Sequence, residues 1–468
     1  MSGKRRTLAG RRRVVGHTQE RLAEVLGVER TTVVRWEAGE TTPQPWCRPK
    51  LAQALDVSVE ELDTMLAEGR TVEDGRSQSS SEPRANSQLC ELDTAEEPQD
   101  DLEHDPVLVA PWNHRGTVEA AVMLSGGDWV KRRVVLSLTG TALTAPAHQW
   151  LVHEPERLAS GLSGRRISAD MVRQLIAMIA ELRKMDDIAG GGSVFSLAQY
   201  EFGWVAGLLD QAVYDERTGR MLFVALAELG QLCGWAAYDA GHSGLAQRYY
   251  VAALRAAHSA DDRPLGAHIM TFMSHQAARQ GQPAEAVTFI ETALAGARGH
   301  VTPGLLAQLH SQQAYAFAAL HDTSACMAAI SQARTQVDQL KPDDDPPWLY
   351  WMSRSLVTVR SGDCFLKLGQ VEQAAAMLNE GVAEFSVSFV RDRQIYITYL
   401  ANALARPGKQ RDLDAAAGLG MESIDLAESL DSNRSRNLLR DLCHQMTPHA
   451  RVPAVGDFLE RARGLVTV

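Results

Sequence analysis

The clearest chemistry in this sequence belongs to basic side chains at its N-terminus. The first 13 residues contain six basic groups and no acidic one: Lys4, Arg5, Arg6, Arg11, Arg12 and Arg13. Such groups bind nucleic-acid phosphates whatever the base sequence. The whole chain has a formal net charge of -11, so the basic groups form the tip of a small module on an acidic body. We predict that Arg5, Arg6 and Arg11 contact the backbone of duplex DNA.

Other patterns with known chemistry are weak. The six cysteines include no C-x-x-C pair and no partner histidine at zinc spacing, which predicts reduced core thiols. Residues 190–192 are Gly-Gly-Gly without the lysine of a phosphate loop, so we interpret them as a hinge. Residues 343–345, three aspartates between prolines, lack EF-hand spacing and are interpreted as a solvated loop. We expect no enzyme, no metal and no cofactor. A hidden enzyme is an alternative that would require a pocket of acids or bases with perturbed pKa values.

The sequence around these candidates divides into regions of different composition. Residues 1–69 show dense helical patterning. Residues 70–105 are rich in Ser, Glu and Asp and poor in large apolar residues, which predicts a disordered acidic linker. Apolar helical periodicity then returns, which predicts an all-α protein. We expect a connector and the start of a solenoid over 106–226, helical repeats over 227–433 and capping helices over 434–468.

One apolar stretch has the composition of a signal or membrane segment. Residues 134–147 are internal, however, and far short of the roughly 20 residues that a membrane span needs. We interpret them as a buried helix, with residues 134–136 as a weak strand candidate. The thinly spread cysteines and the lack of a leader pattern favour a cytoplasmic protein with no membrane role.

The N-terminal region is predicted to form five short helices. Thr18 can cap a helix over 19–26 by accepting a hydrogen bond from a free backbone N–H group. Gly27 makes a tight turn before a helix over 30–38, which Gly39 ends. Two helices joined by such a turn form a helix-turn-helix. The other helices are expected over 8–15, near 47–55 and after a capping box at Ser58 and Glu61.

A family resemblance lies in residues 18–39, which read T-Q-E-R-L-A-E-V-L-G-V-E-R-T-T-V-V-R-W-E-A-G. This segment closely resembles the phage-repressor-like (Cro/C1, XRE) helix-turn-helix family, with small residues at Ala23 and Gly27 as in that family. The chain departs from the pattern at Glu29, where the family has Ser or Thr as a helix cap. The resemblance implies a pair between Arg12 and Glu37, and a core made of Leu22, Leu26, Val33 and Trp36.

The same resemblance implies DNA-binding roles by position. Gln19 would donate to a phosphate, and Arg30 would hold a guanine through its O6 and N7. We expect the head to bind double-stranded DNA as a homodimer that reads two half-sites about one helical turn apart. The residues implied to face the major groove are Arg30, Thr31, Thr32 and Val34, with Arg35 reaching either a base or a phosphate.

The C-terminal half contains an internal repeat. Aligning Gly241, Gly281, His321 and Gly369 gives two spacings of 40 residues and one of 48. Small residues lie seven positions before these and large apolar residues nine positions after, which predicts helical hairpins in which the large side chain fills the space left by the small one. The small residues are Gly234, Ser274, Ala314 and Gly362, and the large ones are Tyr250, Ile290, Ile330 and Leu378.

This pattern resembles the tetratricopeptide repeat over residues 227–386, with a degenerate fifth unit over 391–430. The combination of this repeat region with the N-terminal helix-turn-helix resembles actinobacterial regulators that carry an XRE-type domain and C-terminal tetratricopeptide-like repeats. Such α-solenoids present a concave groove, whose aromatic, amide and charged side chains suit an extended peptide, although single aromatics such as Trp235 could simply pack between repeats. The residues expected in the groove are Gln231, Trp235, Tyr238, His268, Thr271, His275, Arg279, Gln308, Tyr315, Asp363 and Lys367.

These features together predict a sequence-specific transcription regulator. The head would bind an operator, and a peptide, small molecule or protein in the repeat groove would modulate that binding. The alternative is a scaffold in which the repeats recruit partners and the head does not read DNA.

Overall fold

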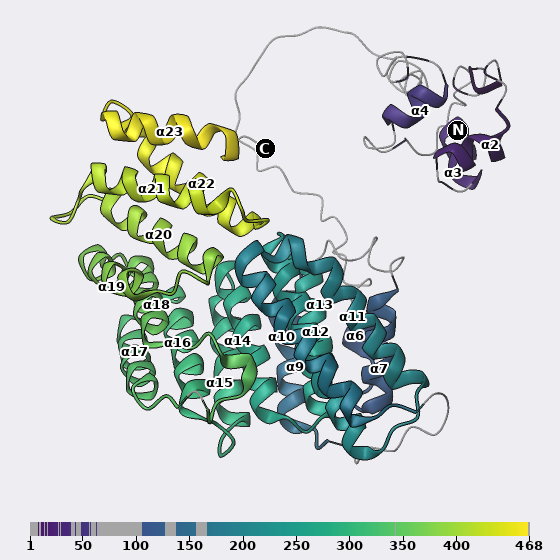
Figure 1. Cartoon of the computed structure of the whole chain (residues 1–468), viewed down its shortest axis with the longest axis horizontal. Helices are drawn as coiled ribbons and strands as arrows, with labels where there is room; N and C mark the ends of the chain where they lie inside the picture. Colours follow the sequence, from purple (N-terminus) through teal and green to yellow (C-terminus); the bar gives the residue numbers. More distant parts are fainter. Residues whose placement is uncertain are drawn as a thin grey trace, which may run out of the picture. The chain divides into compact units, whose positions relative to one another are not determined.

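The computed structural model describes residues 8, 11–13, 15, 17–26, 28, 30–38, 43, 48–55, 57, 62, 105–126, 137–155, 166–341 and 343–466. The chain divides into two compact units, residues 1–94 and residues 95–468, which we call the head and the body (Figure 1). In these ranges every named element is a helix, and the one extended feature is an isolated bridge between Arg166 and Val213. The all-α prediction is confirmed.

The head contains the predicted pair of short helices, α2 (Gln19–Leu26) and α3 (Arg30–Ala38), followed by α4 (Arg48–Ala54). Thr18 caps α2, because its Oγ1 accepts from the backbone N–H of Arg21 at 3.1 Å. The predicted core side chains Leu22, Leu26, Val33 and Trp36 are all buried together. The turn at Gly27, the departure at Glu29, the stop at Gly39 and the capping box at Ser58 and Glu61 lie outside the described residues.

The body is built from helices alone. In chain order they are α6 (Pro106–Val109), α7 (His114–Ser125), α9 (Gly140–Val152), α10 (Ala169–Ala189), α11 (Gly191–Gln211), α12 (Glu216–Asp239), α13 (Ser243–Ser259), α14 (Arg263–Arg279), α15 (Pro283–Gly296), α16 (Pro303–Ala319), α17 (Thr323–Val337), the 3-10 turn η1 (Pro347–Leu349), α18 (Arg354–Lys367), α19 (Val371–Glu384), α20 (Val390–Ala405), α21 (Leu413–Ala427), α22 (Asn433–Met446), the 3-10 turn η2 (Thr447–His449) and α23 (Pro453–Val466).

Five hairpins, α12–α13, α14–α15, α16–α17, α18–α19 and α20–α21, stack side by side into a solenoid (Figure 1). The predicted packing of small against large residues is confirmed. A Cβ built on Gly234 would lie 2.5 Å from the ring of Tyr250, and one built on Gly362 would lie 2.6 Å from Leu378 Cγ. Because the glycines leave this space, the paired helices approach closely.

The hairpin turns need a left-handed residue, and they obtain it in two ways. Gly241, Gly281 and Gly369 have φ values of 93°, 77° and 74°. His321, which replaces the glycine of the third unit, adopts φ 58° and keeps the same turn. A non-glycine residue in this conformation is strained by about 1–2 kcal/mol.

Two expectations about the connecting segments need correction. Asp105, assigned to the linker, is buried in the body, where its carboxylate pairs with Arg248 at 2.8 Å; the linker residues before it lie outside the described part. Residues 190–192 are a packed corner and not a hinge, because a Cβ on Gly190 would lie 2.8 Å from the carbonyl oxygen of Asp431 and one on Gly191 would lie 2.7 Å from Ala236.

Two apolar segments are part of the core. Of the apolar stretch, residues 137–147 are described and residues 134–136 are not. Residues 140–147 lie in α9 with Leu143 and Ala147 buried, as predicted. Helix α12 is long and apolar enough to cross a membrane by length and composition, and most of it is buried inside the body.

Candidate functional site

The described head presents one polar, solvent-facing side of α3. Arg30, Thr31, Val34 and Arg35 are exposed and Thr32 is half-buried, whereas Val33 and Trp36 point into the core. Val34 is 38% exposed although it is apolar. An arginine and a methyl-bearing side chain on one exposed helix face match the donors and apolar contacts that read bases in a major groove. The structure therefore brings the predicted groove-facing residues onto one surface.

A buried ion pair holds this helix in place. Arg12 donates through Nε to Glu37 Oε1 at 2.6 Å and through Nη2 to Glu37 Oε2 at 3.2 Å, as the family resemblance implied. Gln19 Nε2 also donates to Glu37 Oε2, at 2.7 Å. The carboxylate of Glu37 thus ties the start of α2 and residue 12 to the end of α3, and one N–H of Gln19 is engaged within the head.

Other predicted DNA-binding residues already have partners in the head. The exposed Arg30 forms an ion pair with Glu20, Nε to Oε1 at 2.8 Å, which would have to open before Arg30 reached a base. Arg11 Nε donates to the backbone oxygen of Leu55 at 2.9 Å, which connects the first helical residues to the end of α4. Arg5 and Arg6 lie outside the described residues, and phosphate contact by these arginines stays a prediction.

The body contains a cavity on the inner side of the solenoid. Side chains from α10, α12, α14, α16, α18, α20, α22 and the η1 segment line it, and it holds about 130 Å³ of space that water-sized molecules can reach. The predicted groove residues in its wall are Gln231, Trp235, His268, Thr271, His275, Gln308, Tyr315 and Asp363.

The other three predicted groove residues support this wall from behind. Arg279 Nη1 donates to the hydroxyls of Tyr399 at 2.9 Å and Tyr315 at 3.3 Å. The Lys367 ammonium lies 5.1 Å from the ring centre of Tyr315. Tyr238 packs against Trp235, with ring centres 5.9 Å apart. The sequence columns thus identified one connected surface.

A segment that sequence analysis treated as an ordinary loop covers part of the cavity. We call residues 343–352 the strap; they belong to the 48-residue gap between the third and fourth repeats. Trp348 packs on His268 with ring centres 4.2 Å apart, and the Tyr350 hydroxyl donates to Asp187 on α10. The extra repeat length was the available signal. The strap makes the groove a partly enclosed cavity.

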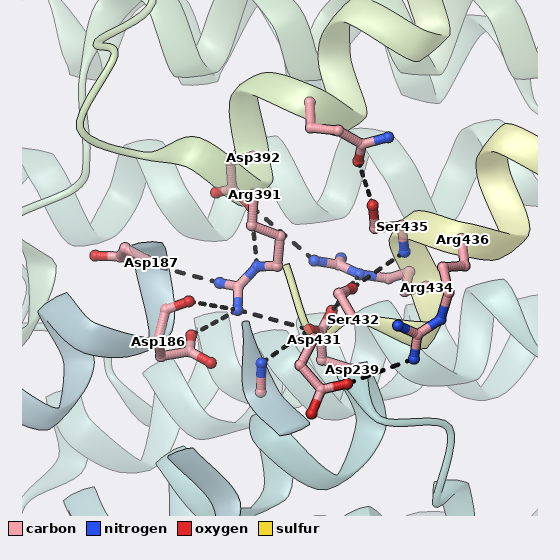
Figure 2. Close-up of polar contacts among 12 residues, drawn as sticks. Asp186, Asp187, Asp239, Arg391, Asp392, Asp431, Ser432, Arg434, Ser435 and Arg436 are labelled. Atoms are coloured by element: carbon pink, nitrogen blue, oxygen red, sulfur yellow. Dashed lines mark hydrogen bonds and ion pairs between the residues drawn. The ribbon is translucent and has the colours of Figure 1, made fainter. Parts of the chain in front are cut away.

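A cluster of acids and arginines that no sequence pattern indicated lies at one end of the cavity (Figure 2). We call it the clasp, and it consists of Asp186, Asp187, Asp239, Arg391, Asp392 and Arg434. Arg391 Nη1 lies 2.7 Å from Asp186 Oδ2 and 3.8 Å from Asp239 Oδ2, while Arg434 Nε donates to Asp239 Oδ1 at 3.1 Å. The clasp joins α10 and α12, at the start of the solenoid, to α20 and α22.

The pKa values of the clasp acids shift in opposite directions. Burial raises the pKa of Asp187 to about 7, although Arg391 opposes this effect. It also raises the pKa of Asp186. Burial acts in the same sense on Asp239, but Arg391, Arg434 and hydrogen bonds from Gly191 and Ser432 outweigh it and lower the pKa of that carboxyl. Asp239 is therefore the firm anion of the clasp.

The other end of the cavity is rich in cations. Arg279, Arg360 and Lys367 surround Asp363, whose pKa is raised by burial despite these neighbours. Burial and nearby cations lower the pKa of His275 well below its ordinary value. Both ring nitrogens of His275 are buried without a hydrogen-bond partner in the described part of the chain.

Comparisons with known proteins agree with the head and add little on the body. Residues 5–65 match the family model of a helix-turn-helix domain. No curated relative matches the chain. Among solved structures, a Rap protein complexed with competence and sporulation factor is 12% identical with a TM-score of 0.36, and the match covers 63% of this chain and 98% of that one.

Two further solved structures are similar at the same low level. Aspartyl phosphate phosphatase F from Bacillus subtilis is 12% identical with a TM-score of 0.32, covering 66% of this chain and 97% of that one. The tetratricopeptide-like repeats of a kinesin light chain from Podosopora anserina are 16% identical with a TM-score of 0.31, covering 43% and 95%. The description of the body rests on its own stacked hairpins.

The head and the body have different folds. The exposed face of α3, the pair between Arg12 and Glu37 and the family match agree at the N-terminus. The stacked hairpins have the packing expected of tetratricopeptide-like repeats. Residues 5–65 are a helix-turn-helix domain, joined to an α-solenoid of tetratricopeptide-like repeats.

Proposed function

We propose that this protein is a sequence-specific, DNA-binding transcription regulator whose body senses a ligand. The observation that carries the proposal is the exposed face of α3, where Arg30, Thr31, Val34 and Arg35 stand together within a matched helix-turn-helix domain. These side chains supply a bidentate guanine donor and apolar contacts to thymine methyls. In this proposal the protein acts in the cytoplasm. It binds DNA as a homodimer, because two heads would read two half-sites one helical turn apart.

The proposal assigns the cavity of the body a binding role and no catalytic step. The perturbed acids Asp186 and Asp187 contact Arg391 and Tyr350, which supports a role in holding structure and ligand. A ligand changes DNA binding only if it favours one arrangement of the protein over another. Because the cavity lies between the first and the last hairpins, its occupant can change how the body closes.

The test is selection of operator sequences from randomised duplex DNA by the full-length protein, with a salt titration. We expect enrichment of a roughly palindromic motif. Arg30→Ala should change the preferred base at one position and cost about 1–3 kcal/mol of binding free energy. Arg115→Ala, which removes an exposed arginine of the body, is the matched control and should change nothing.

A second variant tests the ion pair that occupies Arg30. Glu20→Gln removes an exposed carboxylate that would repel phosphates and also releases Arg30, so DNA affinity should rise. If the full-length protein enriches no motif and binds no DNA at low salt, the regulator proposal is wrong and the scaffold becomes the better description.

A further inference from the structure

The two ends of the body cavity differ in the ionisable groups that predominate. At the clasp, the four carboxyl groups of Asp186, Asp187, Asp239 and Asp392 face two guanidinium groups. Burial raises the pKa of Asp186 and Asp187, so a cationic ligand group there would favour their ionised forms. At the other end, Arg279, Arg360 and Lys367 surround the single carboxylate of Asp363. Buried charges without a counter-charge are costly, so each end favours a ligand group of the opposite sign.

The charges at both ends are accessible from the cavity. At the clasp, the side chains of Asp187 and Asp392 are 15% and 33% exposed. At the other end, Arg360 donates to the neutral amide of Gln312 at 3.1 Å. Arg360 lines the cavity and forms no ion pair within the ranges that the structure describes, whereas Lys367 lies behind the wall, against the ring of Tyr315. The groups that line the cavity are therefore able to pair with an incoming ligand.

Helix α20 gives the distance between the two ends. Asp392 lies in its first turn, and Tyr399, which accepts from Arg279, lies seven residues later. At 1.5 Å per residue this separation is about 10 Å along the helix axis. The wall between the ends is aromatic, with Trp235, Tyr315 and Trp348 among its side chains. A flat molecule with charges at its two ends suits a cavity with such aromatic walls.

We propose that the cavity binds a small zwitterion with a flat apolar body, its cationic group facing Asp187 and Asp392 and its anionic group facing Arg360. The inference rests on the proposed ligand-sensing function and names the class of ligand. A ligand with one charge would leave the other end of the cavity uncompensated. The strap, which covers part of the cavity, favours a small molecule over an extended peptide.

Three matched probes test the charge requirement on the full-length protein by isothermal titration calorimetry. They are 4-(aminomethyl)benzoate, a rigid aromatic zwitterion; 4-methylbenzylamine, which keeps only the cation; and 4-methylbenzoate, which keeps only the anion. The zwitterion should bind at least about tenfold more tightly than either other probe, since each buried charge-assisted contact contributes a tenfold change or more. Equal binding of a singly charged probe, or no binding of the zwitterion at millimolar concentration, would overturn the proposal.

Two variants test which charged group of the ligand binds at each end of the cavity. Asp187→Asn should remove the advantage of the zwitterion over 4-methylbenzoate, and Arg360→Gln should remove its advantage over 4-methylbenzylamine. The controls are Asp170→Asn, an exposed acid at the other end of α10, and Arg354→Gln, an exposed arginine on α18; both should keep the full selectivity. If each end variant weakens all three probes equally, the charge assignment is wrong.

The binding experiment does not involve DNA. Loss of motif enrichment with intact zwitterion binding would overturn the regulator function alone. Motif enrichment without zwitterion selectivity would overturn only the ligand class. Circular dichroism of each variant separates loss of selectivity from loss of folding.

Discussion

In the repeat hairpins, neighbouring helices meet through small and large apolar side chains, such as Gly234 against Tyr250 and Gly362 against Leu378. At the clasp, the first part of the solenoid meets the last hairpins through carboxylates and guanidinium groups. The first kind of contact is non-directional and strengthens with the area buried. The second kind depends on each partner being present, because an unpaired buried charge is strongly unfavourable.

The apolar hairpin contacts therefore stabilise the body, whereas the ion pairs of the clasp are the contacts that a ligand can change. The hairpin contacts repeat along the chain and lie within one unit each, so a ligand in the cavity leaves them unchanged. The clasp closes the cavity and contributes its wall, so a bound charge competes directly with the pairs of Arg391. We therefore expect ligand effects to begin at the clasp.

The largest expected effect comes from removing the central cation of the clasp. Arg391→Met should lower the free energy of unfolding by about 3–5 kcal/mol, because it leaves Asp186 and Asp239 buried without this partner. Urea unfolding followed by circular dichroism measures the change. The matched control is Arg354→Met, which breaks an exposed pair with Asp338 and should cost less than about 1 kcal/mol.

A double variant sharpens this test. Adding Asp186→Leu to Arg391→Met removes both members of the 2.7 Å pair and should recover part of the lost stability. If the double variant is no more stable than Arg391→Met, the loss does not come from an uncompensated charge, and the contrast with the apolar hairpins is wrong.

The next effect is a pH dependence that the hairpins lack. The pKa of Asp187 is raised to about 7 in the folded state, so folding favours its protonated form. Its contribution to stability is full below the unfolded pKa near 4 and is lost as the pH rises to 7, by at most about 4 kcal/mol. Asp187→Asn should remove this part of the pH dependence of unfolding, whereas Asp170→Asn should leave it unchanged.

A smaller loss is expected from overpacking a hairpin. Gly362→Ala places a Cβ 2.6 Å from Leu378 Cγ, so it should destabilise the body by about 1–3 kcal/mol. Gly418→Ala is the control, because nothing lies within 4 Å of the added Cβ and alanine is the better helix former by up to about 1 kcal/mol. Equal effects of the two changes on the thermal unfolding midpoint would contradict close packing at Gly362.

The smallest effect concerns the hairpin turns. His321→Gly should stabilise the body by about 1 kcal/mol, because glycine adopts φ 58° without strain. Gly281→Ala should destabilise it by a similar amount, and its added Cβ meets no atom within 4 Å, so the backbone alone is tested. A result of the same sign for both changes would mean that φ does not limit these turns.

Local patterns in the sequence were sufficient for the head and the repeats. The cap at Thr18 and the spacing of apolar residues predict the bounds of α2 and α3. The apolar residues of this pattern include Leu22 and Trp36, which are buried in the core of the head. The columns of small and large residues indicated the hairpins and most of the cavity wall that comes from the first helix of each repeat. These features depend on residues that lie within about one hairpin of each other, so periodicity records them.

The tertiary structure alone decided the clasp and the strap. Arg391 and Asp186 are 205 residues apart in the chain, and Tyr350 is 163 residues from Asp187. An ion pair over such a separation has no periodic signature, and an aspartate near a helix end has the same pattern whether it is solvated or buried. The superhelical path of the stacked hairpins brings these groups together, and only that path makes an open groove into a charged cavity.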